Sequence, residues 1–405
     1  MPVLLTLVCL SVGVAIAWPL SRAMGRRAGW ILAMLYLLAT AFFTPAALPV
    51  LTGTTDINAT DFSVPWVPGL DVNFAFHTDG IGVLFTYIAL VIGAVVFLYA
   101  TKYLTDEENH TSFYLVMTIF TLSMVGLVLT NDLVVLFISW ELTSLASFLL
   151  IARSGLGGQA ASMRTLLITF IGGLTLLAAV TLMAFTAGTT NITEVLAHSM
   201  WSDLGFTTLV AVLIMIAAAT KSAQFPFHVW LPDAMAAATP VSAYLHAAAV
   251  VKAGIFLLMR FSPAFHDNMT WNLTLVFLGL FTSIIGGWFA FAQPDLKKLM
   301  AYSTVSQLGL IVAAIGTGSE IGMTAAIIHT IAHALFKSGL FMMVGVVDHA
   351  TGTRMISRMP QLYKAMPVSF AVTLLGTAAM AGIPPLFGFL SKETILTAVL
   401  EHPAG

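Results

Sequence analysis

Long apolar stretches separated by short polar ones run along the whole chain. An apolar stretch of about 18 residues or more is long enough to cross the hydrocarbon core of a bilayer as an α-helix. The pattern predicts about twelve membrane-spanning helices, at approximately residues 3–20, 28–51, 80–104, 112–130, 132–152, 164–188, 205–223, 241–261, 271–292, 299–317, 321–347 and 366–400.

The composition agrees with this pattern. Of the 405 residues, 59% are hydrophobic and only 8% are charged, and the mean hydropathy is +0.97, which is too apolar for a soluble fold. We therefore predict an all-α polytopic membrane protein. The single cysteine, Cys9, excludes an internal disulfide and a cysteine-ligated cluster. No sequence motif predicts a bound cofactor or a nucleic-acid partner.

The positions of the basic residues predict the orientation in the membrane. Arg260 is the one basic residue in a loop that follows an even-numbered span, and basic residues favour cytoplasmic loops, so the N-terminus is expected outside. Residues 52–79 carry acidic but no basic side chains and are predicted to form an extracytoplasmic loop. Its acidic residues are Asp56, Asp61, Asp71 and Asp79. Eleven basic residues lie in loops after odd-numbered spans, namely Arg22, Arg26, Arg27, Lys102, Arg153, Arg164, Lys297, Lys298, Arg354, Arg358 and Lys364.

Residues 220–252 do not follow the pattern of an ordinary membrane helix. Lys221 and Lys252 lie in apolar surroundings, and Pro226, Pro232 and Pro240 interrupt the segment between them. A lysine at bilayer depth costs about 2.5–3.5 kcal/mol and therefore marks a functional site by default. Transporters build ion sites from broken helices beside buried charges. The segment is therefore the first candidate for a functional site.

Two further spans carry isolated titratable residues. Glu141 lies in the middle of an otherwise uncharged span, where it is either part of a functional site or a structural carboxylate paired with a neighbouring helix. Asp132, at the start of that span, is expected to cap the helix or lie at the surface. His246 precedes Lys252 by six residues, about 120° around one continuous helix, so the two would line one cavity without sharing a face.

A third group follows helical spacing. His329, His333 and Lys337 are four residues apart and would form one stripe with about 6 Å between levels, close enough for a proton to pass through one water molecule. Two histidines at this spacing could also bind zinc, but no third ligand is evident, so no metal site is predicted.

The last span repeats the features of residues 220–252. Pro384 and Pro385 interrupt it, and Lys392 follows. We therefore predict two repeats, 112–261 and 271–405, after an N-terminal region of residues 1–111. Five spans are an odd number, so tandem copies would be inverted in the membrane; the second copy would be incomplete. Burial favours a neutral lysine and a nearby carboxylate favours a charged one, so such groups could switch protonation and conduct protons laterally.

Several segments together resemble a known family. They are WELTS around Glu141, TKSAQFPFHVWLPDAM from Thr220, LHAAAVVKAG from Leu245, HTIAHALFK from His329 and GFLSKE from Gly388. In these motifs the chain resembles the antiporter-like subunits shared by respiratory complex I and Mrp-type cation/proton antiporters. The resemblance implies inverted five-helix repeats, each with a broken helix, around a hydrophilic axis. It also implies that Glu141 and Lys221 form the family's charged pair, that Lys337 is the central relay lysine approached through His329 and His333, and that Lys392 is the terminal lysine.

Within the family, the chain is more similar to the N-terminal part of the large A subunit of an Mrp antiporter. Lys252 and the run VVDHATGTR, with Asp348 and His349, carry this similarity. It implies a proton relay that includes His246, Lys252 and His349, exchange of protons with sodium or another monovalent cation, other membrane subunits and lipid as partners, and a bacterial inner membrane. Two alternatives are a proton-pumping subunit of complex I or of a membrane-bound hydrogenase, and a scaffold subunit that no longer transports.

Overall fold

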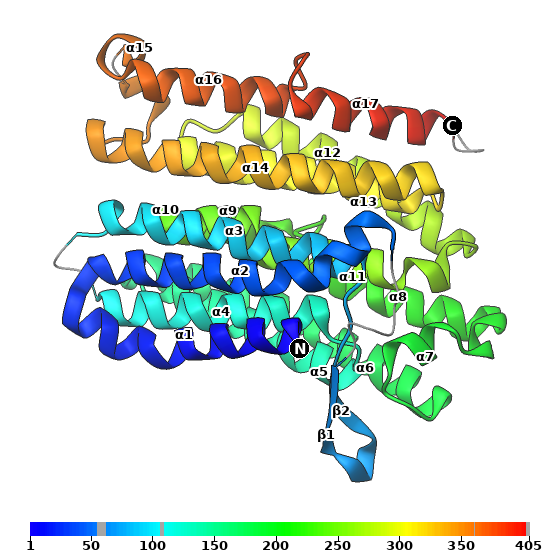
Figure 1. Ribbon diagram of the computed structural model, residues 1–405. Helices are drawn as coiled ribbons and strands as arrows, with labels where there is room; N and C mark the ends of the chain where they lie inside the picture. The colour runs from blue at the N-terminus through cyan, green and yellow to red at the C-terminus, as the bar shows by residue number, and fades with distance from the viewer. Residues whose placement is uncertain (55–61, 106–108, 360, 402–405) are drawn as a thin grey trace.

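The computed structural model describes residues 1–54, 62–105, 109–359 and 361–401. Long helices lie roughly parallel or antiparallel to one another and form a single bundle, with a β-hairpin projecting from one end (Figure 1). The α-helices are α1 (Pro2–Met24), α2 (Ala28–Thr52), α3 (Gly80–Tyr103), α4 (His110–Leu129), α5 (Leu133–Ala152), α6 (Leu156–Ala187), α7 (Ile192–Leu196), α8 (Leu204–Lys221), α9 (Trp230–Asp233), α10 (Thr239–Ala247), α11 (Val250–Phe265), α12 (Met269–Phe291), α13 (Leu296–Gly316), α14 (Glu320–Thr351), α15 (Leu362–Ala365), α16 (Pro367–Ala381) and α17 (Phe387–Leu400).

Shorter 3-10 turns and one antiparallel hairpin connect these helices. The strands are β1 (Phe62–Val67) and β2 (Val72–Phe76), with Phe62 opposite Phe76. The 3-10 turns are η1 (Gly25–Arg27), η3 (Pro68–Leu70), η4 (Ser199–Ser202), η5 (Phe227–Val229), η6 (Ala234–Ala236) and η7 (Ile356–Arg358).

The prediction of an all-α polytopic membrane protein is confirmed. Ten helical stretches of the described chain are long and apolar enough to cross a membrane, and the first of them, Pro2–Thr52, contains both α1 and α2. Helix α16 is shorter because the chain breaks after Ala381. The count of about twelve spans stays a prediction.

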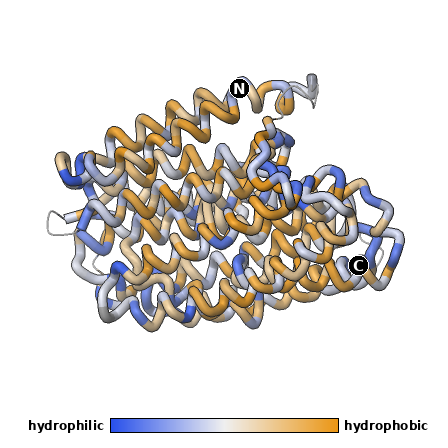
Figure 2. The backbone as a smooth tube through the Cα atoms, turned by 90° about the horizontal axis from the view of Figure 1, so that it is seen from below, coloured by the Kyte–Doolittle hydropathy of each residue, from blue (hydrophilic) through white to orange (hydrophobic). Residues whose placement is uncertain are grey.

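Apolar side chains are common on the outside of the bundle as well as inside it. Trp288 is 74% exposed and Phe291 is 93% exposed, both on α12. Figure 2 shows hydrophobic positions along the helices and hydrophilic ones mainly at the ends of the bundle. An apolar outer surface is what a bilayer requires, because lipid tails are as apolar as the side chains that face them.

Asp132 joins the hairpin to the helices at one end of the bundle. One carboxylate oxygen accepts hydrogen bonds from the N–H groups of Val134 (2.8 Å) and Val135 (3.0 Å), which caps α5. The other accepts from the Asn73 N–H (3.0 Å) and the Thr190 hydroxyl (2.7 Å). The predicted capping role is confirmed, and the side chain is buried. Asp56 and Asp61 of the predicted loop lie outside the described residues.

Both proline-containing segments interrupt helices, as predicted. Helix α8 ends at Lys221, and after a gap that contains Pro226 the chain continues through η5, α9 and η6. Helices α16 and α17 lie end to end beside α14, with Pro384 and Pro385 between them (Figure 1). Pro240, by contrast, lies in the first turn of α10, a position that proline favours.

The predicted span over residues 241–261 falls within one candidate membrane span, Thr239–Phe265, but its helix is not continuous. The chain leaves helical geometry at Ala248 and Ala249, so His246 belongs to α10 and Lys252 to α11. Both alanine N–H groups bind the carbonyl of Tyr244, at 2.9 and 3.1 Å. The angle of about 120° expected between the two side chains on one helix therefore does not apply.

Candidate functional site

A set of titratable side chains lies buried in the bundle. Burying a charged group is costly unless it is hydrogen-bonded or paired, so each member needs a partner. Glu141, Lys297 and Lys392 belong to the set but are less completely enclosed than the rest, with Lys297 at 2% exposed. The fully buried members are Lys221, His246, Lys252, His329, His333 and Lys337.

Lys221 rests on helix α5. Its ammonium donates hydrogen bonds to the carbonyl of Trp140 (2.6 Å) and to the hydroxyl of Thr143, and it lies 4.3 Å from the centre of the Trp140 ring. Among the described residues no direct ion pair joins Lys221 to Glu141, although the two charges interact electrostatically. The predicted pair is therefore brought together on neighbouring helices but is not in contact.

Two adjacent glycines of α6 make room for this part of the site. A Cβ atom added at Gly173 would overlap the carboxylate of Glu141, and one added at Gly172 would overlap the hydroxyl of Thr220. Oxygen Oε1 of Glu141 is buried without a hydrogen bond among the described residues. The glycines thus let α6 approach the helices that carry Glu141 and Lys221.

Lys252 connects the part of the site around Glu141 and Lys221 to α14. Its ammonium donates to the carbonyl of Thr330 at 3.3 Å, between His329 and His333 in the sequence. His329 Nδ1 lies 3.0 Å from the hydroxyl of Ser391 on α17. Both ring nitrogens of His333 are buried without a hydrogen bond among the described residues. The predicted stripe on α14 therefore faces the interior and meets α11 and α17.

Lys337 continues the stripe and rests on helix α13. Its ammonium donates to the hydroxyl of Ser303 (2.5 Å) and to the carbonyl of Met300 (3.3 Å). His246 packs against α14, with its ring 4.6 Å from that of Phe341, and interacts electrostatically with Lys337. The structure therefore groups His246 with α14.

Lys392 lies at the second helix interruption. Its ammonium is 3.4 Å from the carbonyl of Ala381, the last residue of α16. The side chain is half-buried and interacts electrostatically with His329 and Lys337. Lys392 on α17 and the titratable residues of α14 therefore influence one another's charge.

The structure places one predicted relay residue apart from this set. His349 is exposed near the end of α14, where its ring lies 4.2 Å from that of Tyr103. Its neighbour Asp348 is less exposed and interacts electrostatically with Lys297.

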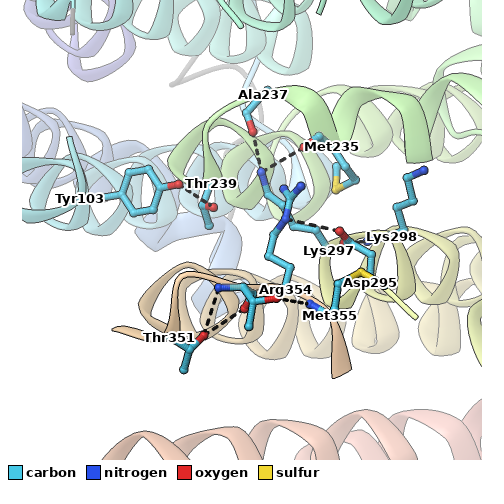
Figure 3. Close-up of polar contacts among 11 residues, drawn as sticks. Tyr103, Met235, Ala237, Thr239, Asp295, Lys297, Lys298, Thr351, Arg354 and Met355 are labelled. Carbon is cyan, nitrogen blue, oxygen red and sulfur yellow. Dashed lines mark hydrogen bonds and ion pairs between the residues drawn. The ribbon is translucent and has the colours of Figure 1, made fainter. Parts of the chain in front are cut away.

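Sequence reasoning missed Lys297. The basic-residue pattern assigned it to a loop, but its side chain is buried near the start of α13. The ammonium donates to the carbonyls of Ala237 (2.5 Å) and Met235 (3.2 Å), as Figure 3 shows. The only signal in the sequence was a second lysine immediately after it.

One feature is common to all five of these lysines. Each donates to a backbone carbonyl of another helical element or of the residue that ends it. The pairs are Lys221 with Trp140, Lys252 with Thr330, Lys297 with Ala237, Lys337 with Met300, and Lys392 with Ala381. The ammonium groups are therefore held by the main chain, and their chemistry is that of groups that bind and release protons.

Comparison with known proteins identifies the family to which this arrangement belongs. Residues 130–404 match the family described as NADH:quinone oxidoreductase/Mrp antiporter, transmembrane. Residues 65–114 match complex I, chain 5 N-terminus. The A subunit of the Na⁺/H⁺ antiporter from Alkalihalophilus pseudofirmus is 41% identical over 395 residues, which are 92% of this chain and 48% of that protein. The chain thus spans about half the length of the curated relatives it matches.

Solved structures agree with the sequence relatives. A chain of the Mrp complex from Dietzia sp. DQ12-45-1b is 50% identical with a TM-score of 0.93, covering 100% of this chain and 44% of that one. A chain of respiratory complex I from Thermus thermophilus is 26% identical with a TM-score of 0.84, covering 100% and 83%. The resemblance seen in the sequence motifs is confirmed: the chain belongs to the NADH:quinone oxidoreductase/Mrp antiporter family of membrane proteins.

Proposed function

We propose that this chain is the N-terminal, proton-translocating part of the large A subunit in a multisubunit Na⁺/H⁺ antiporter of a bacterial plasma membrane. The observation that carries the proposal is the buried set of lysines and histidines, which extends from α8 to α17 and has Glu141 at one end. The names of the related antiporter proteins support sodium as the exchanged cation.

Protons would move between these groups in sequence. Glu141 and Lys221 form the first station, Lys252 connects it to α14, and Lys337 and Lys392 complete the path. Both ring nitrogens of His246 and His333 and one of His329 are buried without a protein partner among the described residues. Water molecules that reach these nitrogens would complete the relay, because buried polar groups require a hydrogen-bonding partner.

The path fits an inverted-repeat architecture. We propose that residues 112–261 and 271–405 form the two repeats after an N-terminal region, residues 1–111. Each repeat contains one interrupted helix with a lysine near the gap, Lys221 in the first and Lys392 in the second. We also propose that the N-terminus is extracytoplasmic. The loops after odd-numbered spans are rich in Lys and Arg, and such loops favour the cytoplasmic side of the membrane.

Sodium-driven collapse of a proton gradient tests the proposal. Everted vesicles that carry the full complex should lose an imposed proton gradient when sodium is added, with no redox substrate present. Lys221→Ala should abolish most of this response in assembled complexes, because it removes a protonation site, and Lys252→Ala should weaken it. Lys364→Ala, which removes an exposed lysine from α15, is the matched control and should transport normally.

Two outcomes would contradict the proposal. Normal transport by assembled Lys221→Ala complexes would remove the relay role of that lysine. If sodium has no effect and NADH oxidation instead builds the gradient, the chain serves in a redox pump of the complex I type.

A further inference from the structure

The Lys297 ammonium lies at the end of the short helical turns that follow the interruption after α8. Its two acceptors, the carbonyls of Met235 and Ala237, belong to η6 and the residue that follows it (Figure 3). The hydroxyl of Thr239 donates to that of Tyr103 at 3.1 Å and attaches this segment to α3. The segment that carries the two carbonyls therefore also has a contact with α3 that does not involve Lys297.

Such carbonyls attract cations for a general reason. The last carbonyls of a helix lack partners within it and carry partial negative charge. In transporters, the ends of broken helices and nearby unwound carbonyls coordinate monovalent cations. Here the cation in contact with the carbonyls is the ammonium group of the protein's own lysine. Arg354 repels this ammonium, and two carboxylates, Asp348 and Asp295, attract it.

A cavity adjoins this position. It has a volume of about 340 Å³, and Met235, one of the two carbonyl residues, contributes to its wall. Two ion pairs lie along it, Arg164 with Asp233 and Arg354 with Asp295, the second at 3.4 Å. Each pair is neutral, and Lys298 adds one positive charge to the cavity walls. Of the two carbonyl residues, Met235 borders this space.

We propose that the carbonyls of Met235 and Ala237 form a monovalent-cation site, which the Lys297 ammonium and a sodium-sized cation occupy in turn. The inference rests on the proposed antiport function and deepens it. When the ammonium loses its proton to a water molecule, the neutral amine leaves the carbonyls and a cation takes its place. The site carries one positive charge before and after, so one proton leaves for each cation that binds.

The alternative is that Lys297 only caps the helix end, as lysines commonly do. The two cases differ in what a neutral side chain does. A structural cap replaced by glutamine leaves a weaker helix end and no new ligand site. An exchangeable occupant replaced by glutamine leaves the carbonyls open to sodium at every pH.

The test measures the unfolding temperature of the purified full complex as sodium replaces N-methylglucamine at constant ionic strength. A ligand that binds the folded state raises this temperature in a saturable way. For the wild type, we expect the sodium effect to strengthen as the pH rises, because the neutral lysine competes less. For Lys297→Gln at neutral pH, the sodium concentration at half-saturation should be lower than in the wild type by about tenfold or more. It should not depend on pH.

Two further variants complete the design. Lys364→Gln is the control, because Lys364 is exposed on α15 and does not line the cavity; it should behave like the wild type. Lys297→Arg keeps a permanent positive charge, so its sodium response at high pH should be lost. This second comparison remains decisive if Lys297→Gln assembles poorly.

Equal sodium responses in the wild type, Lys297→Gln and Lys297→Arg would overturn the cation site and leave Lys297 as a cap. That failure is separable from failure of the proposed function. The wild-type complex would still exchange sodium for protons in vesicles in the first case, and would not in the second.

Discussion

Replacing Thr143 by valine removes one acceptor from the Lys221 ammonium and keeps the approximate shape of the side chain. The carbonyl of Trp140 remains as the other acceptor. A hydrogen bond to a charged group contributes about 1.5–3 kcal/mol, and Lys221 is fully buried, so no solvent replaces the lost partner. The protonated form of Lys221 is therefore destabilised by about that amount, while the neutral form is affected little.

The expected result is a shift in the pH dependence of transport. About 1.4 kcal/mol corresponds to one pH unit, so the alkaline limb of the rate profile should move to lower pH by about one to two units. The assay measures the initial rate of sodium-dependent gradient collapse in everted vesicles from pH 6 to pH 10, in steps of about half a pH unit.

The matched control is Thr165→Val on α6. Its hydroxyl is also fully buried but donates only to the carbonyl of Ala161 in its own helix, at 2.9 Å. This variant should leave the pH profile unchanged. If assembled Thr143→Val complexes keep the wild-type profile, or if both variants shift it equally, the hydrogen bond to Lys221 does not set its protonation.

Three further predictions follow from other parts of the structure. Gly173→Ala should abolish most transport in assembled complexes, because its Cβ would displace the carboxylate of Glu141; vesicle assays measure this. Asp132→Asn should lower the unfolding temperature of the complex and affect transport less, because the amide NH2 group cannot accept the hydrogen bonds that one carboxylate oxygen takes from Asn73 and Thr190. Single cysteines at Ser154 and Ser202, in a background without the native cysteine, should react with an impermeant thiol reagent from opposite sides of the membrane.

Each of these has its own contradicting result. Gly157→Ala, also on α6, is the control for Gly173→Ala, because nothing lies within 4 Å of its added Cβ; equal loss in both would point to a general defect in α6. An unchanged unfolding temperature for Asp132→Asn would mean that the contacts of Asp132 with Asn73 and Thr190 do not stabilise the fold. Labelling of both cysteines from outside intact cells would refute the proposed orientation.

The sequence predicted the features that depend on local chemistry. Long apolar runs have few alternatives to helices in a membrane, Asp132 precedes its helix in a capping position, and Pro226 and Pro384 cannot continue a regular helix. The sequence also predicted the titratable stripe of α14, because residues four apart on one uninterrupted helix lie on the same face.

Features that depend on contacts between distant segments were not predictable in this way. The break at Ala248 contains neither proline nor glycine, so nothing local signals it. Lys297 and Lys298 are adjacent and chemically identical, yet they lie about 100° apart around α13, and of the two it is Lys297 that meets the carbonyls of Met235 and Ala237. The separation of Lys221 from Glu141 likewise depends on how α5, α6 and α8 pack.

The use of main-chain carbonyls by the buried lysines has a consequence for genetics. A side-chain substitution can delete each donor, but no codon change removes an acceptor such as the carbonyl of Thr330 or Ala381. A mutational scan would therefore identify the lysines and overlook their main-chain acceptors. Replacing a single backbone amide by an ester, which alters the main chain itself, would be needed to test the carbonyl acceptor of each contact.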